Sequence, residues 1–158
     1  MHIVFFIVLT LFLIVTQTII LPSFSWFDQC FDLLIIEILF VSFISSHFSI
    51  VLAIIIIGCV MDSISAIPFF YHIFSYVWIY IIVQIVKQLL FQRSTLFVFI
   101  ISIVSISIQH CFLLFSVFLH QGAESIWEFN FGLLIRQVFW GVVFIPPSIW
   151  VLNAFWQN

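Results

Sequence analysis

The positions of the charged side chains limit what this chain can fold into more than any other feature. Three Lys or Arg and six Asp or Glu residues leave five uncharged stretches, residues 1–27, 38–61, 63–86, 94–123 and 137–158. Each is at least as long as the roughly 20 residues that cross the hydrocarbon core of a bilayer as a helix. Hydrophobic residues make up 66% of the chain, far more than a soluble domain needs. The chain is therefore predicted to be an integral membrane protein without a soluble domain.

The apolar runs predict helices and not barrel strands, because they are continuous and lack the alternation of apolar and polar residues that barrel strands show. The predicted fold is all-α, a polytopic membrane helix bundle of about six transmembrane helices that forms one domain over residues 1–158. The expected helices cover residues 3–21, 31–46, 48–66, 69–87, 94–119 and 132–153.

Two helix boundaries have alternatives. The first segment could be mistaken for an export signal, but it has no Lys or Arg ahead of its apolar core, its apolar stretch is longer than that of such a signal, and no small-residue cleavage site follows it. We interpret it as the first spanning helix, which stops at Pro22. The turn between the second and third helices rests on the serines near His47. Without that turn, residues 38–61 form one helix and the chain has five.

The few cations predict the orientation in the membrane. Lys87 and Arg93 flank one loop, and the positive-inside tendency places such a loop in the cytoplasm. With six helices, both termini are then cytoplasmic. Arg136 does not follow this rule, since it is predicted at the outer end of the last helix.

Asp62 is the most informative residue, because an acidic side chain inside an apolar membrane helix is costly unless something offsets its charge. Gly58 lies one turn before it, and Ser65 and Ala66 lie one turn after it. This small-residue strip would allow a second helix to approach closely. We favour a hydrogen bond of Asp62 in a helix contact over a ligand or ion site, or a position near the outer interface.

Two later helices have polar side chains at helical spacing. Residues 94–119 place serines and a glutamine within a narrow arc, which should face the bundle and is a candidate source of donors for Asp62. Its members are Ser102, Ser105, Gln109 and Ser116. Residues 69–87 have a slanting polar ridge, which favours helix packing over a ligand pocket. The ridge consists of His72, Tyr76, Tyr80, Gln84 and Gln88.

Signatures of catalysis are absent from the sequence. It has no H-E-x-x-H, G-x-S-x-G or Gly-rich phosphate loop. Its three cysteines and widely separated histidines form no metal or disulfide pattern. An intramembrane aspartyl peptidase would need a second carboxylate beside Asp62, and Glu37 is the one conceivable mate. We instead expect Glu37 to pair with Arg136, and we predict a non-enzymatic protein with no cofactor and no nucleic-acid partner.

Residues 58–68 resemble the signature of the MreD family, the bacterial rod-shape-determining membrane proteins. That family has Gly-x-x-x-Asp, then a Ser-Gly-like pair, a Pro and a second Gly. The matching residues here are Gly58, Asp62, Ser65 and Pro68. Ala66 stands where a Gly is common, and Phe70 stands where the second Gly is expected.

Shorter matches extend the resemblance over nearly the whole chain. Asp32 and Leu33 resemble the start of the family's second helix, and His47 falls in a short inner turn. Residues 90–93 resemble the family's inner loop. Residues 146–147 are prolines in the last helix, where the family also has prolines. The resemblance implies a scaffold of the machinery that elongates the lateral cell wall and determines rod shape. It also implies a location in the bacterial inner membrane, a bitopic MreC-like partner and, through it, an MreB-like cytoskeleton and the cell-wall synthases.

A second hypothesis for the function is a substrate-binding subunit of a vitamin transporter, and it follows from the fold that the resemblance implies. The MreD family is similar in fold to the substrate-binding subunits of energy-coupling-factor transporters, which are also small six-helix proteins. A vitamin-binding subunit should have a polar pocket on its outer face, whereas a scaffold needs helix faces that complement protein partners.

Overall fold

The computed structural model describes residues 2–23, 31–44, 48–65, 70–89, 95–121 and 131–157. Within these ranges the chain forms six α-helices and no strand, which confirms the predicted all-α class. They are α1 (His2–Val15), α2 (Leu34–Ile44), α3 (Phe48–Ile64), α4 (Tyr71–Leu89), α5 (Thr95–Gln121) and α6 (Phe131–Gln157). A π-helical turn, Thr16–Ile20, and a 3-10 turn, Leu21–Ser23, extend α1.

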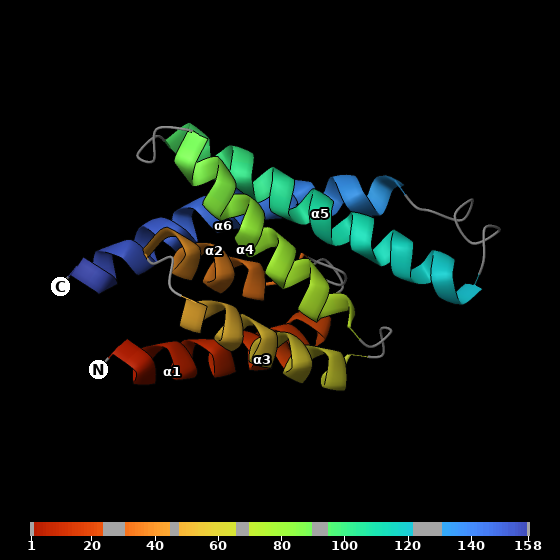
Figure 1. Cartoon of the computed structure of the whole chain (residues 1–158), viewed down its shortest axis with the longest axis horizontal. Helices are drawn as coiled ribbons and strands as arrows, with labels where there is room; N and C mark the ends of the chain where they lie inside the picture. Colours follow the sequence, from red (N-terminus) through yellow and green to blue (C-terminus); the bar gives the residue numbers. More distant parts are fainter. Residues whose placement is uncertain are drawn as a thin grey trace.

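The structure separates the second and third helices. α2 ends at Ile44 and α3 begins at Phe48, and the two run in opposite directions (Figure 1). Residues 38–61 therefore do not form a single helix, and the five-helix alternative is wrong. The observed boundaries differ from the predicted ones by a few residues. α2 begins later than expected, and α6 continues to Gln157, through both of its prolines.

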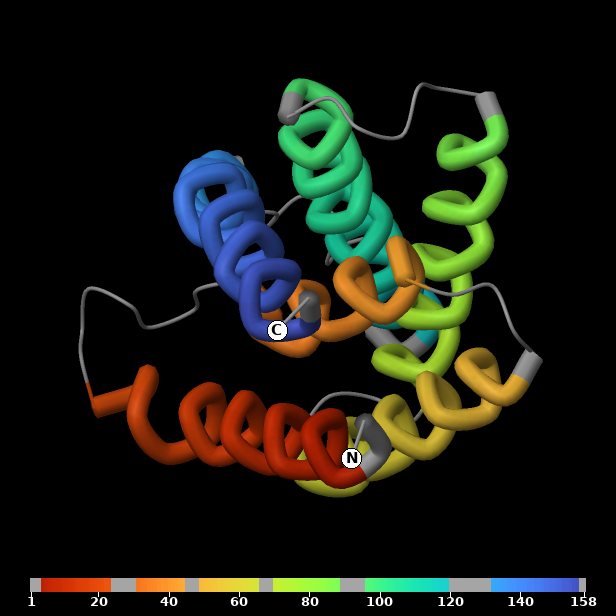
Figure 2. The backbone as a smooth tube through the Cα atoms, turned by 90° about the vertical axis from the view of Figure 1, so that its left-hand side faces the viewer, coloured from red at the N-terminus to blue at the C-terminus, as the bar shows by residue number. Residues whose placement is uncertain are grey.

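α2 lies at the centre of the bundle. It is placed between α1 and α3 on one side and α4, α5 and α6 on the other (Figure 2). Every residue from Leu34 to Phe40 is buried, and α2 packs against α1, α3, α4 and α6. A helix that is apolar all round is expected to be buried on all sides, and the sequence of α2 fits that position.

Three helical segments are long and apolar enough to cross a membrane: Val4–Ser23, Leu96–Leu119 and Gly132–Trp156. Large apolar side chains cover their outer faces, and Trp150 is 75% exposed. A surface of this kind suits contact with lipid better than contact with water. α2 and α3 are shorter apolar helices. The 11 residues of α2 extend over about 16 Å, roughly half of a 30 Å hydrocarbon core.

The carboxyl end of α2 is capped by side chains of α4. Lys87 Nζ donates to the carbonyl oxygens of Ser42 and Phe43 at 3.3 and 2.9 Å, and Gln84 Nε2 donates to the carbonyl oxygen of Ser42 at 3.1 Å. The last carbonyls of a helix have no partner within the helix, and a cation there also complements the helix dipole. Lys87, which sequence analysis used as a marker of the cytoplasmic loop, thus also holds α2 against α4.

Candidate functional site, a buried polar network

Asp62 lies near the end of α3 and is 5% exposed. Its Oδ1 accepts a hydrogen bond from the backbone N–H of His72 at 2.8 Å, and His72 Nδ1 lies 2.8 Å from the same oxygen. With its proton on Nδ1, the imidazole also donates to Asp62. The donors therefore come from the first turn of α4 and not from the polar face of α5 that sequence analysis offered. Asp62 Oδ2 has no hydrogen-bond partner among the described residues.

The contact between α3 and α4 is close at Gly58. A Cβ atom at this position would lie 2.8 Å from the Cα atom of Ile73, so no side chain fits unless the two backbones move apart. Near the end of α3, Ser65 Oγ lies 3.4 Å from His72 Nδ1. Ala66, the remaining residue of the small-residue strip, and Pro68, which belongs to the family pattern, lie outside the described residues.

Asp32 precedes α2 and is the most connected side chain of the site. Its Oδ1 accepts from the backbone N–H of Leu34 at 3.0 Å, and its Oδ2 accepts from Gln109 Nε2 at 2.9 Å and from the hydroxyl of Tyr76. The positive end of the helix dipole also favours a carboxylate here. Asp32 therefore caps α2 and joins it to α4 and α5.

The π-helical turn at the end of α1 supplies a further cap. Gln17 lies in this turn, and its Oε1 accepts from the backbone N–H of Leu33 at 3.0 Å. Sequence analysis did not single out Gln17. The signal that could have found it is an amide side chain within an otherwise apolar segment, which is expected to face a polar partner.

Aromatic residues of α4 connect the two carboxylates. The Tyr71 hydroxyl donates to the carbonyl oxygen of Gln109 at 3.3 Å. The ring of His72 packs against Tyr71 with centroids 4.7 Å apart, and against Tyr76 with centroids 5.6 Å apart. We call the set of Asp32, Asp62, Tyr71, His72, Tyr76 and Gln109 the Asp32–Asp62 network. It contains side chains from α3, α4, α5 and the start of α2.

The polar face of α5 points into the bundle. Two of its serines and its glutamine form hydrogen bonds with different parts of the protein. Ser102 and Ser105 are buried, and their hydroxyls donate to the carbonyl oxygens of Val98 and Ile101 in the same helix. Gln109, whose amide donates to Asp32, belongs to the Asp32–Asp62 network. The difference arises because a serine side chain is short enough to bond to its own helix, whereas glutamine reaches beyond it.

The polar ridge of α4 also faces mostly inward. His72, Tyr76 and Tyr80 are buried, and Gln84 contacts α2, whereas Gln88 is exposed. This arrangement agrees with the packing role that the spacing favoured.

Glu37 makes a different contact from the pair with Arg136 that the sequence suggested. Glu37 is 2% exposed, and its Oε1 accepts a hydrogen bond from the Thr10 hydroxyl at 2.6 Å. This bond joins α2 to α1. Arg136 lies near the start of α6, and its side chain is exposed.

The Asp32–Asp62 network can fix the rotation and spacing of helices. Its carboxylates accept hydrogen bonds from protein donors, and among the described residues no group of three or more His, Cys, Asp or Glu side chains is placed to hold a metal ion. The fold and the network define an all-helical protein with three helices long and apolar enough to cross a membrane.

Comparisons with protein families, curated proteins and solved structures found no match to the chain.

Proposed function

We propose that this protein is a non-catalytic, MreD-like membrane scaffold of the cell-wall elongation machinery, which helps to maintain rod shape by binding an MreC-like bitopic protein. The observation that carries the proposal is the junction of α3 and α4. Gly58 and Asp62 carried the sequence resemblance, and both have structural roles there. Gly58 allows the two backbones to approach, and Asp62 accepts hydrogen bonds from His72.

The backbone at Phe70 also supports the resemblance. Phe70 stands where the family pattern has its second Gly, and its φ angle is +76°. A glycine adopts such an angle without strain, whereas other residues seldom do. The chain thus has a glycine-like backbone conformation at a position where the family has glycine.

The chemistry of the site favours a scaffold over an enzyme. Asp32 accepts hydrogen bonds from three protein donors, and Asp62 Oδ1 is engaged by His72. A carboxylate such as Asp32, which has both oxygens engaged by protein donors, is poorly placed to take a proton from a substrate. Such side chains instead hold helix faces in a fixed arrangement, which a protein partner can recognise.

We further propose that all six helices cross the inner membrane, with both termini in the cytoplasm. α2 can do so although it is short, because the side chains of Gln17, Asp32 and Lys87 satisfy backbone groups at its ends. An added amino-terminal cysteine should therefore resist an impermeant thiol reagent in intact cells and react after lysis. Equal labelling before and after lysis would contradict this orientation.

Depletion of the protein in its rod-shaped host tests the function. The cells should become round, since lateral wall synthesis would lose its scaffold, and an MreC-like protein should be recovered with the tagged chain after mild detergent extraction. Rods of normal shape that show a defect in vitamin uptake would instead support a transporter subunit.

Complementation with Asp62 variants tests whether Asp62 acts as a hydrogen-bond acceptor in helix packing or whether its carboxylate charge is required. Asp62→Asn should restore rods, because an amide oxygen still accepts the hydrogen bonds of His72, whereas Asp62→Leu should fail and lower the amount of protein in the membrane. If Asp62→Asn accumulates normally but leaves the cells round, the carboxylate itself is required and the packing account is wrong.

A further inference from the structure

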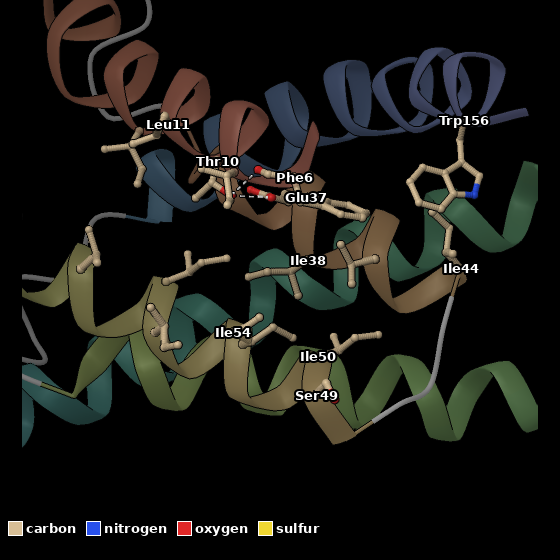
Figure 3. A pocket seen from close by; sticks show the side chains of 17 residues that line it. Phe6, Thr10, Leu11, Glu37, Ile38, Ile44, Ser49, Ile50, Ile54 and Trp156 are labelled. Atoms are coloured by element: carbon tan, nitrogen blue, oxygen red, sulfur yellow. Dashed lines mark hydrogen bonds between the residues drawn. The ribbon is translucent and has the colours of Figure 1, made fainter. Parts of the chain in front are cut away.

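A cavity of about 750 Å³ lies between α1, α2 and α3, with Trp156 of α6 on its wall (Figure 3). Its lining is almost entirely apolar, with many isoleucines from α1, α2 and α3. Ile7 and Leu11 on α1 and Ile56 on α3 line it and are also more than half exposed. The mouth of the cavity is therefore apolar and continuous with the outer surface of the protein.

The carboxyl group of Glu37 is a polar group in the wall of this apolar cavity. It lines the cavity together with Thr10, as Figure 3 shows. Its side chain is buried, and among the described residues its Oε2 has no hydrogen-bond partner. A buried polar atom without a partner is rare in folded proteins and calls for a specific explanation. A ligand that supplies the missing hydrogen bond is such an explanation.

The surroundings of Thr10 indicate what the ligand must offer. Its hydroxyl lies 2.8 Å from the Phe6 carbonyl oxygen and 2.6 Å from Glu37 Oε1, and it has one proton to donate. When Thr10 donates to Phe6, a protonated Glu37 donates to Thr10 through Oε1. When Thr10 donates to Glu37, the carboxyl is either ionised or has its proton on Oε2. Oε2 is an acceptor when the carboxyl is ionised or has its proton on Oε1, and the ligand must then supply a donor. A ligand hydroxyl can also accept from a protonated Oε2.

The volume of the cavity and the depth of Glu37 in the protein limit the class of ligand. The cavity volume of about 750 Å³ lies within the range of small-molecule sites. Glu37 lies in the first turn of α2, where all neighbouring residues are buried. To bring a charged headgroup to that position is costly, but a neutral hydroxyl needs only one hydrogen bond.

We propose that this cavity binds one neutral lipid alcohol, with its chain among the isoleucines and its hydroxyl donating to Glu37 Oε2. The site is separate from the Asp32–Asp62 network. The proposal does not depend on the scaffold function, since it is tested by binding to the purified protein.

Binding of radiolabelled hexadecanol to the full-length chain in lipid nanodiscs tests the proposal. One saturable site is expected. Hexadecyl methyl ether should compete about tenfold more weakly than unlabelled hexadecanol, because the ether has the same chain but no donor. Equal competition by the alcohol and the ether would overturn the proposal, since it would mean that the cavity accepts any alkyl chain. Mass spectrometry of lipids that copurify would distinguish an isoprenoid alcohol from a diacylglycerol as the natural source.

Variants of the cavity complete the test. Glu37→Leu should remove the preference for the alcohol over the ether, and Ala53→Phe should abolish binding of both by filling the cavity from α3. Leu52→Phe is the matched control, because Leu52 is exposed on the same helix and does not line the cavity. Unchanged binding in a folded Ala53→Phe protein would place the ligand elsewhere and overturn the assignment.

Discussion

Replacement of Asp32 by Leu is expected to prevent most of the protein from accumulating in a folded state. The substitution leaves three buried donors without their acceptor: Leu34 N, the Tyr76 hydroxyl and Gln109 Nε2. Each such group costs about 1–3 kcal/mol, and the free energy of unfolding of a typical protein is only about 5–15 kcal/mol. The measurement is the fraction of monodisperse protein after detergent extraction, with the midpoint of heat denaturation for the protein that remains.

Companion variants test whether the unpaired donors cause the loss. Asp32→Asn should be less harmful, because its amide oxygen can still cap Leu34 N. Asp32→Leu combined with Tyr76→Phe should be more stable than Asp32→Leu alone, since the second change removes one unpaired donor. If the two changes are simply additive, the Tyr76–Asp32 hydrogen bond contributes nothing, and an unpaired Tyr76 hydroxyl is not a cause of the loss.

Gly58→Leu is expected to separate α3 from α4 and to destabilise the protein by about 3 kcal/mol or more, beyond the usual range of about 1–3 kcal/mol for an overpacked core. The reason is that a Cβ at Gly58 meets Ile73 Cα, a backbone atom that no side-chain rotation can move. Gly58→Ala should also destabilise the protein, although alanine favours a helix over glycine by about 1 kcal/mol. The midpoint of heat denaturation in detergent measures both effects.

Gly141 provides the matched control. A Cβ there would lie 2.0 Å from Ile106 Cδ1, the end of a flexible side chain. Gly141→Ala should therefore be milder than Gly58→Ala, and Ile106→Val should rescue it by removing that atom. Ile73→Ala should not rescue Gly58→Ala, because every residue has a Cα. Rescue by Ile73→Ala would show that the side chain, and not the backbone, limits the contact.

The two carboxylates differ in how far sequence could predict their surroundings. The cost of an acidic side chain in an apolar helix indicated that Asp62 needs a partner, and Gly58 indicated a close helix contact. His72 was assigned to a packing ridge, and its bonds to Asp62 depend on how α4 packs against α3. Asp32 was singled out only by resemblance to a helix start, and its partner Gln109 is 77 residues away.

The sequence by itself determined the helical class and the long apolar segments, because these depend on local hydropathy and on where polar residues interrupt it. The choice between five and six helices depended on the break between α2 and α3, which the structure shows. Only the tertiary structure decided that α2 is central, that Gln17 and Lys87 cap its ends, and that Glu37 faces Thr10. The physical reason is that these contacts depend on the rotation and depth of helices distant in sequence. Hydropathy is nearly uniform around α1, α2 and α3, so their sequences contain little information about that rotation.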